Sequence, residues 1–309
     1  MSSSPEVDTI AVRQPAFTER VVLRHRWPLR WMHWINLLCM LALVGSGLQI
    51  FNAHPALYWG EASAFDRPLL SMRGERLADG RQRGITVIGG QRFDTTGVLG
   101  LSDHPVTHRP DVRGFPSWTT IPDTRSLALG RRWHFFFAWL WVINGTVYLL
   151  WSIVSRHLSR DLSMKRGDWR GLPQTVRDHL RLRHPVGEAA MRYNPLQKLA
   201  YLGVIFVLAP LAVLTGLAMS PQLGSVLGWW IDLIGGRQAA RTLHFVAMAL
   251  FVLFAVVHVV MVVYAGPINE MRSMITGRFR VRYPKEPAMP PNAKEPAAVD
   301  ADPKELGHD

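Results

Sequence analysis

The sequence predicts an all-α membrane protein: a membrane four-helix bundle with a long external loop between the first and second helices. Long uncharged, apolar blocks alternate with Arg-rich blocks along the 309 residues. Each apolar block can supply the roughly 20 residues that a helix needs to cross a bilayer. The predicted spans are residues 31–51, 133–155, 199–219 and 242–264.

The formal net charge of +12 is distributed as in membrane proteins, not as in proteins that bind nucleic acid. Residues 156–192 carry nine Lys or Arg, whereas residues 220–240 carry one. The first 30 residues carry five, and the chain from residue 265 carries seven. Because positively charged loops stay in the cytoplasm, we expect a multi-pass protein of the plasma (inner) membrane with both termini cytoplasmic.

Three parts are predicted. Residues 1–29 form a cytoplasmic N-terminal segment and residues 30–282 the transmembrane domain. Residues 283–309 form a disordered cytoplasmic tail, because they are rich in Pro, Ala, Lys, Glu and Asp. The external loop, 52–130, has 79 residues and should therefore have its own structure.

Two loops contain further local signals. Gly89-Gly90 predicts a two-residue hairpin turn in the external loop. The Pro- and Trp-rich stretch 115–122 is suited to the membrane interface. In the cytoplasmic loop, residues 172–183 predict a short basic amphipathic helix that lies against lipid headgroups.

Histidine is the expected cofactor ligand. The single cysteine, Cys39, rules out internal disulfides, Cys-based zinc sites, iron–sulfur clusters and a CxxCH haem attachment. Four of the twelve histidines fall inside the spans, where polar residues are costly and usually face a functional site. They are His33, His134, His244 and His258. His104 and His108 are a weaker metal candidate, because no helix is evident around them.

Spacing and topology pair these four histidines. His244 and His258 are fourteen residues apart, which corresponds to about 21 Å along a helix and nearly the same face. With cytoplasmic termini, His244 lies at the depth of His134 near the outer side. His258 lies at the depth of His33 near the cytoplasmic side. Opposed imidazoles between helices are typical of a bis-histidine haem b site, so two haems are predicted.

Arginines and glycines complete the predicted haem sites. Four arginines open the helices about one turn outward from the histidines and are candidates to bind haem propionates: Arg30, Arg131, Arg132 and Arg241. Four glycines would thin the helices beside a macrocycle: Gly45, Gly47, Gly145 and Gly216. Each set also has an ordinary interpretation, as boundary charges and as helix-packing residues.

Four segments carry a resemblance to a known family. They are RWMHW (30–34), GRRWHFFFAW (130–139), YNPLQKLAY (193–201) and RTLHFVAMALFVLFAVVHVVMV (241–262). Over about residues 25–280 the chain resembles the four-helix dihaem cytochrome b subunits of formate dehydrogenase, nickel–iron hydrogenase and thiosulfate reductase. The thiosulfate reductase branch, also described as cytochrome b561-like, is the most similar.

The resemblance implies that the four histidines bind two haems b. It implies a respiratory-chain subunit that anchors a periplasmic oxidoreductase, suspected to be of the molybdopterin type, and exchanges electrons with the quinone pool. It places quinone near Asn194 and His258, with Tyr193 and Gln197 as neighbours. Asn194 before Pro195 is equally an ordinary helix start, so capping remains open. The long external loop departs from the formate dehydrogenase subunits, so their docking surface cannot be transferred.

Three alternatives remain. The histidines could relay protons in a transporter or channel. The chain could be a stand-alone quinone-linked reductase, or a structural anchor without haem. No hydride-transfer or substrate-binding motif is evident, which favours an electron-transfer subunit over a catalytic one.

Overall fold

The computed structural model describes residues 17–181, 193–224, 226 and 228–284. Four of its helical segments are long and apolar enough to cross a membrane. They are α1 (Trp27–Phe51), α2 (Leu127–Val154), the segment Pro195–Ala218, and α8 (Arg237–Ala265). Each begins one to two turns before the predicted span, because hydropathy marks the apolar residues and not the polar first turns of a helix.

The third segment is not a regular helix. It consists of α4 (Pro195–Gly203), the π-helical turn η4 (Val204–Leu208) and α5 (Ala209–Ala218). Pro210 lies at the junction of η4 and α5. A proline has no N–H and its ring clashes with the carbonyl four residues earlier, so the regular hydrogen-bond ladder is interrupted here.

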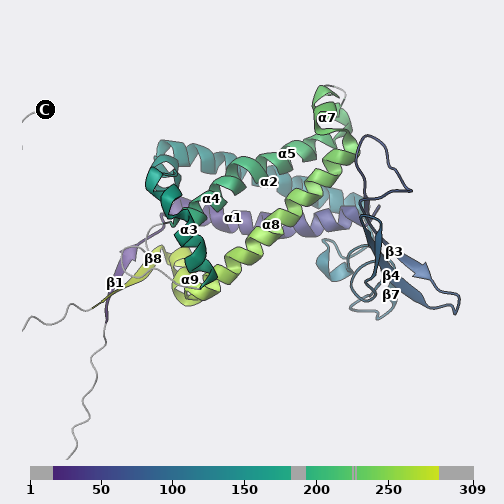
Figure 1. The fold of residues 1–309 in the computed structure, drawn as a ribbon, viewed down its shortest axis with the longest axis horizontal. Helices are drawn as coiled ribbons and strands as arrows, with labels where there is room; N and C mark the ends of the chain where they lie inside the picture. The colour runs from purple at the N-terminus through teal and green to yellow at the C-terminus, as the bar shows by residue number, and fades with distance from the viewer. Residues whose placement is uncertain (1–16, 182–192, 225, 227, 285–309) are drawn as a thin grey trace, which may run out of the picture.

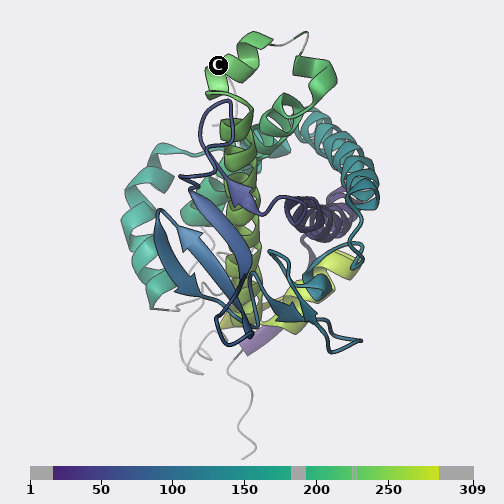
Figure 2. The ribbon, with the colours of Figure 1, turned by 90° about the vertical axis from the view of Figure 1, so that its right-hand side faces the viewer.

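The spanning helices pack as two pairs, α1 with α2 and α5 with α8 (Figure 1). Figure 2, which looks along the bundle, shows α1 and α2 side by side. Cys39 and Ala42 of α1 pack against Phe137 of α2. The Asn144 side chain donates a hydrogen bond of 2.8 Å to Asn36 across this pair. Such interhelical bonds between side chains stabilise helix pairs in lipid.

The prediction of an all-α fold is wrong, because the external loop contains a sheet. The sheet has the order β2 (Ala56–Leu57), β3 (Leu70–Arg76), β4 (Gln82–Ile88), β5 (Gln91–Asp94), with every pair antiparallel. A further pair, β6 (Ser102–Asp103) and β7 (Pro110–Asp111), follows. The hairpin at Gly89-Gly90 is confirmed, with φ of 57° and 87°. The 115–122 stretch contains the short helix η1 (Ser117–Thr119).

We call the side of the bundle that carries this sheet the loop end. The short helices α6 (Pro221–Gly224) and α7 (Gly228–Ile234) connect α5 to α8 there. Figure 1 shows α7 and strands β3 and β4 together at this side.

The opposite side is the terminal end. Here β1 (Phe17–Leu23) pairs antiparallel with β8 (Arg278–Pro284), so β1 lies within the predicted N-terminal segment and β8 reaches into the predicted tail. The helices α3 (Arg166–Leu180) and α9 (Pro267–Thr276) and the π-turn η2 (Leu158–Leu162) lie at the same end (Figure 1). The amphipathic helix predicted at 172–183 corresponds to α3, and its last residues lie outside the described ones.

Candidate functional site

The four membrane histidines face each other in two pairs. The ring centres of His134 on α2 and His244 on α8 are 6.1 Å apart, with an interplanar angle of 69°. Those of His33 on α1 and His258 on α8 are 6.3 Å apart, with an angle of 58°. We call these the loop-end pair and the terminal-end pair. They are the pairs that spacing and topology predict, and α8 contributes one ring to each.

The ring separations fit an iron atom between the imidazoles. A metal–nitrogen bond of about 2.0–2.1 Å on each side, plus about 1.1 Å from nitrogen to ring centre, gives about 6.2–6.4 Å. The observed separations are 6.1 and 6.3 Å. Each pair could therefore hold a haem iron between its two imidazoles.

At the loop end, the hydrogen bonds of His134 define which nitrogen can bind a metal. The Ser46 hydroxyl donates to the Ala42 carbonyl at 2.6 Å, so its oxygen accepts from His134 Nδ1 at 3.1 Å. A hydroxyl has a single proton to donate. His134 therefore carries its proton on Nδ1, and the lone pair of Nε2 is left for a metal.

His244 is held in the same manner. The Thr215 hydroxyl donates to the Leu211 carbonyl at 2.6 Å and accepts from His244 Nδ1 at 3.2 Å. The Ala212 carbonyl, which can only accept, lies 3.0 Å from the same nitrogen. Both loop-end imidazoles thus have a protonated, hydrogen-bonded Nδ1 and an available Nε2.

Two of the predicted glycines lie against these rings. A Cβ on Gly47 would be 3.4 Å from His134 Cε1, and one on Gly216 would be 3.3 Å from His244 Cε1. The other two do not: Gly45 makes room for the Ile121 side chain, and Gly145 has no neighbouring atom within 4 Å. The space beside Gly47 and Gly216 is filled by imidazole.

Aromatic rings surround the terminal-end pair. His258 stacks on Phe254 with ring centres 6.1 Å apart, and His33 meets Trp34 edge-on at 5.4 Å. His33 Nδ1 is buried and has no hydrogen-bond partner among the described residues. From Phe254 the aromatic contacts continue to Tyr201 at 6.4 Å and on to Tyr193 at 5.6 Å.

The four candidate propionate arginines are in different environments. Arg30 Nε is buried without a hydrogen-bond partner in the described part of the chain, so an anionic group beside it would satisfy a costly donor. Arg241 donates to the His54 carbonyl and therefore holds the external loop. Arg131 is exposed and lies over Phe135 at 5.6 Å, and Arg132 is also exposed.

The predicted quinone residues begin α4. Asn194 Oδ1 accepts from the Gln197 backbone N–H at 2.8 Å, and Gln197 Oε1 accepts from the Asn194 N–H at 3.2 Å. This capping box confirms Asn194 as the N-cap, with Pro195 in the first turn. Quinone contact by the two amides stays a prediction.

Tyr193 precedes this capping box. Burial, and then the neighbouring Tyr201, raise the pKa of Tyr193, so its hydroxyl stays protonated.

A polar pair that the sequence did not single out lies beside Tyr193. The helix α2 ends at Val154, and Arg156, with φ of 55°, reverses the chain. His157 then lies with Nδ1 2.7 Å from Asp161 and its ring 6.4 Å from the Tyr193 ring. The spacing of four residues between His157 and Asp161 was visible in the sequence, but the chain reversal was not.

The external loop caps the start of α8. The Gly60 carbonyl accepts from the N–H groups of Gln238 and Ala239 at 3.0 and 3.1 Å. The Glu61 carboxylate accepts from the Arg237 N–H at 3.0 Å. These N–H groups have no partner within the helix, so the loop satisfies them. The loop thereby fixes the end of α8 that carries His244.

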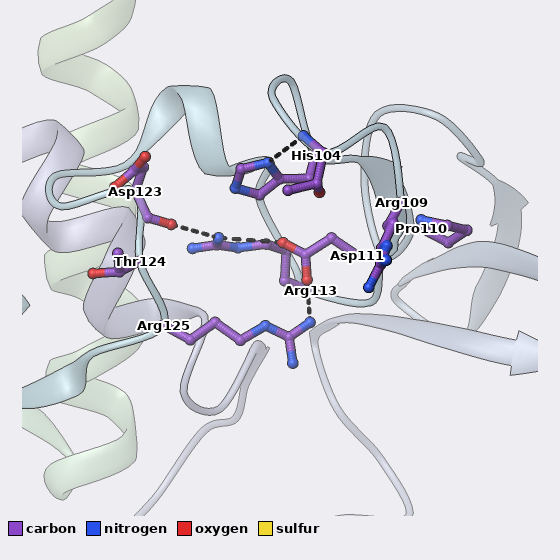
Figure 3. A pocket seen from close by; sticks show the side chains of 9 residues that line it. His104, Arg109, Pro110, Asp111, Arg113, Asp123, Thr124 and Arg125 are labelled. Atoms are coloured by element: carbon purple, nitrogen blue, oxygen red, sulfur yellow. Dashed lines mark hydrogen bonds and ion pairs between the residues drawn. The ribbon is translucent and has the colours of Figure 1, made fainter.

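A second contact joins the loop to the end of α1. Arg113, whose side chain is 3% exposed, donates to Gln49 Oε1 at 2.6 Å and to the Asp123 carbonyl at 3.0 Å. Arg113 lines a pocket of about 370 Å³ together with Asp111 and His104, and Figure 3 shows how these three side chains lie. His104 Nδ1 accepts two backbone N–H bonds of 3.3 Å, so this nitrogen is already used within the loop.

The chain belongs to the prokaryotic cytochrome b561 family, whose model matches residues 24–277. This confirms the family resemblance of the four quoted segments. Membership implies that the chain binds haem b and serves electron transport as a multi-pass membrane protein.

Relatives of the chain are named as subunits of oxidoreductases. The chain is 34% identical to a putative protein-methionine-sulfoxide reductase subunit YedZ1 of Azospira oryzae over 138 residues, 42% of this chain and 63% of the relative. It is 32% identical to a probable Ni/Fe-hydrogenase B-type cytochrome subunit of Cupriavidus necator over 136 residues, 41% of this chain and 56% of the relative. In both, the match spans less than two thirds of the relative's length.

Proposed function

We propose that this protein is a dihaem b cytochrome that transfers electrons between an extracytoplasmic oxidoreductase and the quinone pool. The observation that carries the proposal is the pair of opposed imidazole sets, with ring centres 6.1 and 6.3 Å apart at two depths of one bundle. A haem b bound at each pair would supply a one-electron redox centre. Arg30, Arg131, Arg132 and Arg241 are the candidate partners of the propionates.

The chain's own residues hold and insulate these sites. Ser46 and Thr215 orient the loop-end imidazoles, and the external loop fixes the start of α8. At the terminal end, Phe254 and Trp34 pack against the two rings. The protein thus supplies ligation, orientation and a low dielectric, which are the contributions expected of a protein around a redox cofactor.

Haem stoichiometry tests the proposal. We expect two haems b per purified chain by the pyridine haemochrome assay, and about one in each variant with a single membrane histidine changed to Ala. The control is His108→Asn, since His108 is exposed and Asn tolerates its φ of 51°. One haem in the unaltered protein, or no loss in His33→Ala, would contradict the two-site proposal. A protein without a low-spin haem b spectrum would instead favour the histidine-relay transporter or the structural anchor.

We place quinone at the terminal end, beside Tyr193 with Asn194 and Gln197. Three observations support this. Tyr193 lies at the start of the third spanning segment next to Asn194, its pKa is raised by burial, and aromatic contacts connect it through Tyr201 and Phe254 to His258. We expect a soluble quinol analogue to reduce the purified haem protein, and Tyr193→Phe to slow this reduction at unchanged haem content. Equal rates in the two proteins would exclude Tyr193.

The proposed partner is an extracytoplasmic oxidoreductase subunit, of the molybdopterin type. The names of the relatives support an oxidoreductase partner. The folded loop at one end supports a docking role.

We also propose an inner-membrane location with both termini cytoplasmic, which the Arg-rich 156–192 and terminal segments support. Co-purification and C-terminal reporter fusions test these points. Turnover of quinol with a small oxidant by the purified chain alone would favour the stand-alone reductase.

A further inference from the structure

Two helices that are far apart in the sequence hold the loop-end histidines with the same local structure. On α1, Leu43, Ser46 and Gly47 face His134; on α5, Ala212, Thr215 and Gly216 face His244. We call each set an imidazole cradle. In both, the hydroxyl residue lies three positions after the residue whose carbonyl faces the ring and one position before the glycine.

The distances in the two cradles agree closely. The hydroxyl oxygens lie 3.1 and 3.2 Å from the histidine Nδ1 atoms. Each hydroxyl donates to the carbonyl four residues earlier at 2.6 Å and is therefore left as an acceptor. The Ala212 carbonyl lies 3.0 Å from His244 Nδ1, and Leu43 occupies the corresponding position on α1, three residues before Ser46.

In the described part of the chain, the terminal-end pair shows no such arrangement. His33 Nδ1 is buried and lacks a hydrogen-bond partner there, and the rings that contact His258 are those of Phe254 and His33. The hydrogen-bond partners of Nδ1 therefore differ between the two pairs, although the ring separations are nearly the same. A hydrogen bond accepted from Nδ1–H makes Nε2 a more basic ligand, which favours the oxidised state of a bound metal.

We propose that Ser46 and Thr215 are positioning residues that hold His134 and His244 by Nδ1 and set the reduction potential of the loop-end haem below that of the terminal-end haem. This inference rests on the proposed haem sites. The two hydroxyls would then do more than donate a hydrogen bond to a carbonyl of their own helix.

Potentiometric titration of the holoprotein tests the proposal. The loop-end step is first assigned as the one that disappears in His134→Ala. We expect the unaltered protein to titrate in two steps, with the loop-end step lower. In Ser46→Ala and in the near-isosteric Thr215→Val, the loop-end step should shift to a higher potential with two haems still bound, and the terminal-end step should not move.

Two further variants separate the cradle from general helix stability. Thr146→Ala removes a hydroxyl that makes the same bond to a carbonyl four residues earlier, at 2.8 Å, but is exposed, so neither step should shift. Thr215→Ser keeps the hydroxyl and should titrate as the unaltered protein. If Thr215→Val loses haem, restoration by Thr215→Ser supports the positioning role, and failure of Thr215→Ser to retain haem contradicts it.

The outcomes distinguish this inference from the proposed function. A protein without haem, or no loss in His134→Ala, refutes the haem sites themselves. An unshifted loop-end step in haem-replete Ser46→Ala and Thr215→Val refutes the cradles alone. A loop-end step above the terminal-end step in the unaltered protein refutes the proposed order of potentials.

Discussion

The two histidine pairs of this bundle have nearly equal ring separations, yet different structures hold them in place. At the loop end, hydroxyls, carbonyls and glycines hold the imidazoles, and a folded loop caps the helix that carries His244. At the terminal end, aromatic rings pack against His33 and His258, and a strand pair closes the bundle behind them.

The difference shows that matching ligand geometry does not imply a matching environment. The loop-end site depends on residues far away in the sequence, since Ser46 and His134 are 88 positions apart. The terminal end depends on joining the two ends of the domain, through β1 with β8 and through Arg24, which donates to Glu270 at 2.9 and 3.0 Å. Damage to one end should therefore leave the other end largely intact.

The largest expected effect comes from the loop end, with Arg113→Ala. This substitution leaves the Gln49 side-chain carbonyl without its guanidinium partner, while Asp111 keeps Arg125. Losing a hydrogen bond to a charged group costs about 1.5–3 kcal/mol, and Arg113 makes more than one such bond. We expect faster proteolysis of residues 52–126 and preferential loss of the loop-end redox step. Arg109→Ala, at an exposed position, is the control. Loss of the terminal-end step instead would show that the two ends are not independent.

Acid should weaken the terminal end. Burial, followed by the charge of Arg24, lowers the pKa of His25 from 6.5 to about 4; His33, His157 and Arg30 act in the same direction. Between these pH values the unfolded chain binds a proton that the folded chain does not. Stability therefore falls as the pH drops from 6.5 toward 4, by about 3 kcal/mol, and this loss is absent above pH 6.5.

Hydrogen exchange in detergent can measure this acid effect at each end. Exchange in β1 and β8 should accelerate on acidification more than exchange in β3 and β4. In His25→Leu, the pH dependence at the terminal end should be smaller by this amount. An unchanged pH dependence in His25→Leu would show that other groups are responsible.

The same comparison shows what a sequence can predict. Spans and histidine pairing follow from hydropathy and from the fourteen-residue spacing of His244 and His258, because both depend on regular helix geometry. The cradles could not be predicted, since a Ser or Thr in an apolar span resembles any other small helix residue. Their partners are defined by packing between helices, as with Thr215 and His244, 29 positions apart.

Local signals were present for some other features. Pro210 marks the interruption of the third helix, and Asn194 with Gln197 three positions later matches a capping box. In the external loop, the Gly89-Gly90 turn indicated only β4 and β5, and the strands β2, β6 and β7 have two residues each, too few for an alternating pattern. Hydropathy therefore predicts the bundle but not the structure that closes its loop end.

Two glycine substitutions test how closely the helices pack against the loop-end imidazoles. In Gly47→Ala and Gly216→Ala the new methyl group would lie 3.4 and 3.3 Å from the imidazole carbons, closer than most such contacts. Overpacking typically costs about 1–3 kcal/mol, and we expect weaker haem retention at the loop end. Gly145→Ala is the matched control, because nothing lies within 4 Å and Ala favours a helix by about 1 kcal/mol. Equal haem retention in all three variants would contradict a tight fit at the rings.

The smallest effect concerns Asn194, and it separates capping from quinone contact at the terminal end. Asn194→Ala removes the side chain that accepts from the Gln197 N–H, which should cost about 1 kcal/mol. Asn194→Ser keeps a good cap and should restore the melting temperature. Asn194→Ser also removes the amide, which belongs to the proposed quinone site, so we expect slower reduction by quinol at normal stability. Reduction at the normal rate would show that Asn194 serves only as the helix cap, which Tyr193→Phe alone cannot reveal.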